Sequence, residues 1–235
     1  MTNRSQLGVF ACLLVLALAP LTAAEEPAAS IHLHFGLPKN GKAHPVPAVV
    51  WLVPEPGTPP APFTSHGPYT LLQKNRTFIP HLQVVPIGAA VQFPNEDPYF
   101  HNVFSMYAGK RFDLGLYEAG ATKSVTFSRE GVSYIFCNIH PEMSAVVVAL
   151  SSSLYGIADV DNSVSIRNIP PGDYAVHIWV EGVPESILQD QTRRIHLAGH
   201  AVDLGTIALP LAAGSGASHP NKFGKPYIPL PKQPY

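Results

Sequence analysis

Apolar and polar positions along the chain form short runs that are separated by turn residues. The pattern predicts β-strands at residues 31–35, 48–53, 73–78, 82–86, 90–93, 123–127, 132–137, 144–150, 155–159, 163–166, 174–180, 194–197 and 201–209. A series of short strands with polar turns is typical of a β-sandwich or barrel. Because the chain also holds 25 Pro and 18 Gly and few residues that begin helices, we expect an all-β fold.

Two Pro-rich stretches interrupt the strand pattern. Residues 54–68 contain six prolines and two glycines, which predicts a connector. Residues 211–235 are rich in Pro, Gly and Ser without periodicity, so we expect a mobile or loosely docked tail. The spacing of the strands also changes from Leu154 onward, which indicates that a different unit begins there.

The first residues have the pattern of a secretory signal. Arg4 precedes thirteen apolar residues at 7–19, and small residues at 22–24 precede Glu25. Thirteen apolar residues are too few to span a bilayer, so we expect cleavage and export to the periplasm or the extracellular space. No later run of eighteen apolar residues exists, and we expect no membrane span in the mature protein.

Charge argues against one class of partner. Loss of Arg4 with the signal leaves 14 of the 15 basic residues against 16 acidic ones, a net charge of −2. Nucleic-acid-binding proteins usually carry a strong basic excess, so we expect no nucleic-acid partner.

The residues with the most specific chemistry lie between positions 137 and 143. Cys137, His140 and Met143 fall within seven residues, and His101 stands thirty-six residues before the cysteine. Cys12 lies inside the predicted signal, so Cys137 is the only cysteine of the mature chain. A lone thiol in an oxidising compartment is prone to oxidation unless it is buried or bound to a metal. An inert core cysteine is the alternative reading.

One thiolate, two imidazoles and a weak axial thioether are the ligands of a trigonal copper site. The predicted strands place Cys137 at a strand end and Met143 at the next strand's start, and Pro141 stiffens the loop between them. Taken singly, the histidines would be surface residues and the methionine a core filler. Zinc is an alternative metal, although its structural sites favour more thiolates or carboxylates than this cluster offers.

Residues 76–150 resemble the cupredoxin family, the type 1 blue copper proteins that include plastocyanin and amicyanin. The matching segments are Phe78-x-Pro80, Val84, Gly88, Val91-x-Phe93-x-Asn95, His101-Asn102-Val103 and Phe136-Cys137 with His140 and Met143. The Cys-x2-His-x2-Met spacing is similar to the amicyanin loop. The resemblance implies a Greek-key β-sandwich, a type 1 copper bound by His101, Cys137, His140 and Met143, and an electron-carrier role. It also implies that Asn102 bonds across the site.

The remaining segments resemble other proteins. Gln73-Lys74-Asn75-Arg76 and Cys137-Asn138-Ile139-His140 are similar to exported plastocyanin-like chains of the "methylamine utilization protein" type. Segments 41–53, 158–161 and 169–174 resemble a carboxypeptidase regulatory-like β-sandwich. We therefore expect a second small sandwich that is discontinuous around the cupredoxin. The expected divisions are a signal peptide (1–24), the second sandwich (30–53 plus 154–210), a connector (54–75), a cupredoxin domain (76–150) and a tail (211–235).

The main functional hypothesis is a one-electron carrier that docks transiently on redox protein partners. His140 would be the electron port, with Ile139, Pro141 and Met106 as candidate patch residues. Alternatives are copper binding or delivery without a redox circuit, and a scaffold or adhesion module with an ancillary copper site. An oxidase is disfavoured, because a single type 1 site has no place for oxygen and the chain has no His-Cys-His segment. We expect the protein not to be an enzyme.

His32, His34 and His81 are weaker candidates for metal ligands. His32 and His34 would share one face of a strand, but such pairs form copper clusters only where several occur together. His81 lies on the cupredoxin part, where a packing or surface role is favoured over approach to the site.

Overall fold

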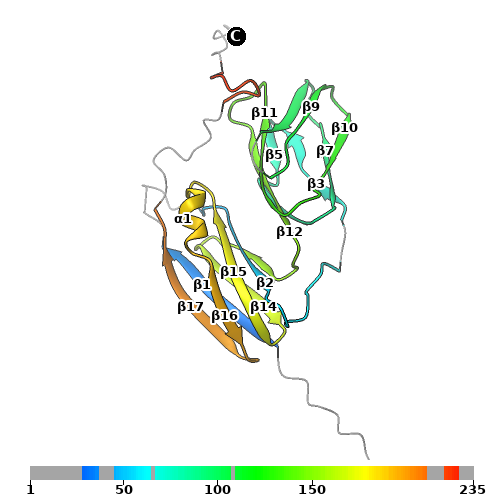
Figure 1. The fold of residues 1–235 in the computed structure, drawn as a ribbon. Coiled ribbons are helices and arrows are strands. Elements are labelled where there is room, and N and C mark those ends of the chain that lie inside the picture. Colours follow the sequence, from blue (N-terminus) through cyan, green and yellow to red (C-terminus); the bar gives the residue numbers. More distant parts are fainter. Residues whose placement is uncertain (1–27, 37–44, 65–66, 107–108, 211–219, 228–235) are drawn as a thin grey trace, which may run out of the picture.

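The computed structural model describes residues 28–36, 45–64, 67–106, 109–210 and 220–227. The predicted signal peptide, 1–24, lies outside these residues. Within the described part of the chain, no helix is long and apolar enough to cross a membrane. The strands form two stacked groups, and one short helix lies beside the group that holds both β1 and β17 (Figure 1).

The first sandwich pairs a five-stranded sheet with a three-stranded one. The larger sheet has the order β6 (Leu82–Pro86), β12 (Ser144–Leu150), β11 (Gly131–Cys137), β8 (His101–Ser105) and β9 (Phe112–Tyr117). The smaller sheet has the order β10 (Thr122–Thr126), β7 (Ala90–Pro94) and β3 (Tyr69–Thr70), and a hairpin joins β4 (Leu72–Lys74) to β5 (Thr77–Ile79). Val91 and Phe93 of the smaller sheet share one buried core with Ile135 and Val147 of the larger one.

The second sandwich combines the beginning of the described chain with its later part. One sheet has the order β13 (Tyr155–Ile157), β2 (Ala48–Pro54), β15 (Gly172–Val180) and β16 (Arg193–Leu197). The other has the order β14 (Ser163–Ile169), β1 (Ala29–Gly36) and β17 (Ala201–Ala208), and α1 (Glu185–Gln189) follows β15. β2 pairs with β15 in antiparallel register, so that Val49 lies opposite Trp179.

Strand β12 contributes to both hydrophobic cores, because both of its faces are buried. Ala145, Val147 and Ala149 belong to the core of the first sandwich. Val146, Val148 and Leu150 belong to the core of the second. Successive side chains of a strand point to opposite faces, so one continuous apolar run supplies both cores. The outer face of the five-stranded sheet is therefore covered by the second sandwich.

Two polar contacts add to this apolar junction. His81 lies between the Ser144 carbonyl (Nδ1, 3.1 Å) and the Glu181 carboxylate (Nε2, 2.9 Å). The indole N–H of Trp179 donates to the hydroxyl of Tyr134 at 3.1 Å. The His81–Glu181 and Trp179–Tyr134 contacts each join a residue of the first sandwich to one of the second.

The all-β prediction is confirmed, with two sandwiches of which one is discontinuous in sequence. The divisions between domains stay predictions, although β3 and β4, which fall in the predicted connector, pair here with β7 and β5. The pattern missed β3, β8 and β9, and Gly115 interrupts the last of these with a φ of 66°. The single strand expected at 73–78 is instead the hairpin of β4 and β5. The pattern also missed α1, because five residues are too few to show a helical period.

Candidate metal centre

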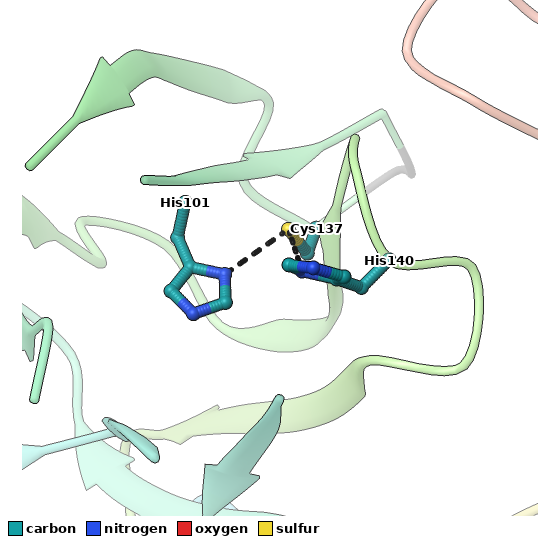
Figure 2. A group of neighbouring side chains, drawn as sticks. All are labelled: His101, Cys137 and His140. Carbon is teal, nitrogen blue, oxygen red and sulfur yellow. Dashed lines mark hydrogen bonds between the residues drawn. The ribbon is translucent and has the colours of Figure 1, made fainter. Parts of the chain in front are cut away.

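Cys137 lies at the end of β11, and the neighbouring β8 begins at His101. The two strands pair so that Cys137 stands opposite Val103, two residues from the histidine. The Sγ atom of Cys137 lies 3.6 Å from Nδ1 of His101 and 3.6 Å from Nδ1 of His140. Figure 2 shows the sulfur between the two imidazoles, both of which turn a nitrogen toward it. Within the described residues, these three side chains are the one group of His, Cys, Asp or Glu that could hold a metal ion.

The loop from Cys137 to Met143 is closed by its own backbone. The Cys137 N–H donates to the Met143 carbonyl at 3.1 Å, and the Met143 N–H donates to the His140 carbonyl at 3.1 Å. These bonds fold the loop back on the end of β11 and return the His140 ring to the sulfur. Pro141 follows the histidine, and its fixed φ limits the conformations of the turn.

Met143 is buried on the same loop. It is 1% exposed and belongs to the apolar core that also contains Cys137 and Val103. Cys137 and His101 are each 0% exposed, whereas His140 is half-buried. Of the three residues, His140 is thus the one that retains exposure to solvent.

Asp97 orients His101 from behind. Its Oδ2 lies 2.8 Å from Nε2 of His101, and its two oxygens also accept the backbone N–H groups of Asn75 (2.6 Å) and Arg76 (2.9 Å). A carboxylate acceptor at Nε2 keeps a proton on that nitrogen, so that Nδ1, which faces the sulfur, is the nitrogen available to a metal. The sequence analysis missed this residue. The one signal in the sequence was the four-residue spacing from Asp97 to His101. This spacing brings the carboxylate to the imidazole only if the chain between them turns in the right way.

Tyr99 is a second residue that the sequence analysis missed. Its ring lies 5.4 Å from that of His101 and 5.8 Å from that of His140, measured between centroids, and Arg76 lies over its face at 5.3 Å. The ring fills the space beside both imidazoles and restricts their rotation.

Burial and hydrogen bonding oppose each other at the sulfur. Burial by itself raises the pKa of the Cys137 thiol, but His101 and the backbone amides of Asn102, Ile139 and His140 stabilise the thiolate and lower the pKa overall. Burial would likewise lower the pKa of His101, yet the neighbouring Cys137 and Asp97 raise it. Burial and the charge of His101 lower the pKa of His140, so its neutral, ligating form is favoured.

Asn102 acts on the sulfur through its backbone. Its side-chain amide donates to Asp113 Oδ1 at 2.6 Å, while its own Oδ1 has no hydrogen-bond partner among the described residues. The family resemblance implied that this side chain bonds across the site. In the structure, the side chain instead joins β8 to β9, and the backbone amide supports Cys137.

The donor set fits a metal ion of the first transition row. Bonds of about 2.3 Å to sulfur and about 2.0–2.1 Å to nitrogen that meet at roughly 110–120° place the two ligand atoms about 3.6–3.8 Å apart. Both observed sulfur–nitrogen distances, 3.6 Å, lie in this range. Thiolate and imidazole donors suit copper better than a hard cation, which prefers oxygen.

The other candidate residues lie elsewhere. His32 is exposed with Nδ1 3.1 Å from the Ser165 hydroxyl, and His34 is on the same strand, β1 of the second sandwich. His81 lies at the junction of the two sandwiches. Met106 follows the end of β8 that is opposite to His101, about 16 Å along the strand, so it does not belong to a patch at the site. Ile139 (36% exposed) and Pro141 do flank His140, and Phe100 (56% exposed) precedes His101.

No protein-family model and no curated protein matches this chain. Solved structures that resemble it include a purple cupredoxin from Nitrosopumilus maritimus (24% identity, 34% of this chain and 96% of that one, TM-score 0.31). A copper-containing nitrite reductase from Thermus scotoductus is 22% identical over 42% of this chain and 25% of its own, with a TM-score of 0.34. An amicyanin mutant in its Cu(I) form is 19% identical over 39% of this chain and 94% of its own, with a TM-score of 0.34. Likeness this weak carries no argument about function, which has to come from the site.

Proposed function

We propose that this chain is an exported type 1 copper protein that carries single electrons between redox partners. The observation that carries the proposal is the buried sulfur of Cys137, 3.6 Å from Nδ1 of both His101 and His140. The proposed ligands are these three residues and Met143. Bound copper would alternate between Cu(I) and Cu(II) and so supply one electron at a time.

The protein's contribution is a rigid, dry set of donors. Asp97 and Tyr99 hold the His101 ring, and the closed loop holds Cys137 and His140. A site that is already shaped for a metal changes little between oxidation states, and a small rearrangement keeps the barrier to electron transfer low. This rigidity supports a carrier over a delivery protein, which must release its metal readily.

The exposure of the ligands supports transfer through His140. Because Cys137 and His101 are fully buried, the half-buried His140 is the proposed path between the metal and a partner. Ile139 and Pro141 would form the apolar surface around it, which suits a small and transient interface. A catalytic site would instead need an open ligand position for substrate.

Titration of the metal-free protein with Cu(II) tests the proposal. We expect one equivalent to produce an intense visible thiolate-to-copper band that Cys137→Ser abolishes. Met143→Leu should shift the band or the reduction potential, whereas the matched variant Met106→Leu should leave both unchanged. A colourless complex, or a band that survives Cys137→Ser, would overturn the proposal. A normal band with slow electron self-exchange and rapid loss of copper to chelators would favour the delivery alternative.

A further inference from the structure

The described part of the C-terminal segment lies on the ligand loop. Figure 1 shows residues 220–227, in red, beside the end of β11 and far from the sandwich that precedes them in sequence. The Tyr227 hydroxyl donates to the Cys137 carbonyl at 2.7 Å. The Lys222 backbone N–H donates to Asn138 Oδ1 at 3.0 Å. Both contacts join residues more than 80 positions apart in the chain, so sequence proximity does not explain them.

The segment has a defined local shape. Asn221 Oδ1 accepts the backbone N–H groups of Phe223 (3.0 Å) and Lys225 (3.1 Å), and the Asn221 N–H donates to the Lys225 carbonyl at 2.8 Å. Gly224, with a φ of 73°, makes the turn possible because other residues rarely adopt this conformation. The turn presents the backbone and the side chain of Lys222 to the first sandwich.

A second route connects the segment to the sulfur. Lys222 Nζ lies 2.8 Å from Asp113 Oδ2, and the other oxygen of Asp113 accepts the Asn102 amide at 2.6 Å. The backbone amide of Asn102 in turn bonds to Cys137. The segment therefore contacts the Cys137 carbonyl directly and is linked to the Cys137 sulfur indirectly, through Asp113 and Asn102.

We propose that residues 220–227 form a strap in which Tyr227 and Lys222 are positioning residues for the Cys137–His140 loop. The contacts of the strap exist without a metal, whereas its effect on a reduction potential rests on the proposed copper function. The strap slows opening of the loop around Cys137. It also directs the hydroxyl proton of Tyr227 toward the carbonyl of Cys137, and positive potential there favours the reduced metal. Losing the strap contacts therefore lowers the reduction potential.

The first test uses the full-length, metal-free protein and the rate at which an uncharged thiol reagent modifies Cys137. The thiol is 0% exposed, so its reaction reports opening of the loop. Loss of one hydrogen bond in Tyr227→Phe or Lys222→Ala is expected to speed the reaction by about 2- to 10-fold, the equivalent of one net hydrogen bond. Matched controls are Tyr155→Phe, which lies in the second sandwich, and Lys225→Ala, one turn further along the strap; both should react at the wild-type rate.

The second test measures the potential of the Cu(II)-loaded variants. We expect Tyr227→Phe to lower it by up to about 59 mV, a tenfold change in the ratio of reduced to oxidised protein, with the visible band retained. If the strap variants react faster with the thiol reagent but the wild-type protein shows no blue band with Cu(II), the strap is supported and the copper function is overturned. A blue wild-type protein in which both strap variants match their controls, in rate and in potential, would overturn the strap.

Discussion

Asp97→Asn is the variant that isolates the role of the carboxylate behind His101. The side chain is 4% exposed and accepts three hydrogen bonds, from the backbone of Asn75, the backbone of Arg76 and Nε2 of His101. The replacement keeps the shape of the side chain but turns one oxygen into an NH2 group. Whichever oxygen is replaced, at least one buried N–H faces another donor, and the remaining bonds lose their charge.

The expected loss of stability follows from the number of hydrogen bonds that the variant breaks. A buried donor without an acceptor costs about 1–3 kcal/mol, so the free energy of unfolding of the metal-free protein should fall by about that amount. The His101 ring would also lose the charged acceptor that fixes its proton on Nε2. Removal of such an outer partner typically weakens metal binding by about 10- to 100-fold, which is the loss of copper affinity that we expect.

Two measurements check the prediction: urea unfolding of the metal-free protein and competition for copper with a chelator of known affinity. Glu96→Gln is the matched control, since Glu96 pairs with Lys74 at the surface, and it should cost at most about 1 kcal/mol and leave the copper affinity unchanged. Nitrogen NMR of the histidine rings reports the tautomer directly. An Asp97→Asn protein with wild-type stability, affinity and His101 tautomer would refute the reasoning.

Three further predictions concern the junction of the sandwiches and the surface of the site. Leu150→Ala, at a fully buried position of β12, should lower the free energy of unfolding by about 2–5 kcal/mol. The control Ile157→Ala, at a position that is 45% exposed, should change it little. Equal losses for both variants in urea unfolding would contradict the burial of Leu150 between the sandwiches. The hydrogen bond to Glu181, against the opposing effect of burial, raises the pKa of His81. The pair therefore stabilises the fold fully below about pH 6.5, and this contribution is lost as the pH rises through the raised value. Measured by unfolding at several pH values, Glu181→Gln should be less stable than wild type in acid and equally stable in alkali. The difference in acid should be under about 1 kcal/mol, because both groups are partly exposed. A difference that stays constant with pH would exclude the link between His81 protonation and stability. Ile139→Asp should slow electron self-exchange of the copper protein about tenfold, since 1.4 kcal/mol of lost docking energy is tenfold, while Ile157→Asp should not, and unchanged exchange by NMR line broadening would place the docking surface elsewhere.

The strands and the ligand spacing were predictable because both are local. A strand with one buried face shows alternating apolar and polar residues in its own sequence. Cys137, His140 and Met143 are close enough in the chain that they share a single loop. The chemistry of thiolate, imidazole and thioether also depends on residue type alone. The strands of the second sandwich were recognised in the same way. Strand β9 of the first sandwich and helix α1 were not, because Gly115 and a length of five residues hide their periods.

Contacts between distant segments could not be predicted from the pattern. Asp97 becomes an orienting residue only when the turn after β7 brings it under His101. The apolar run of β12 indicated burial, but not that its two faces serve two different cores. The Pro-rich composition of the tail predicted loose docking, yet Lys222 and Tyr227 bond to the ligand loop.

The sequence by itself therefore determined the class of fold and predicted a set of donors, since short-range spacing and side-chain chemistry decide these. The tertiary structure decided which groups support the donors and how far water is kept from them. Those properties arise from hydrogen bonds and burial between residues tens of positions apart, which the order of the residues along the chain does not encode locally. The sequence pointed to Cys137, His140, Met143 and His101, and the folded chain adds the Asp97 carboxylate behind His101 and the contacts of Lys222 and Tyr227 with the loop.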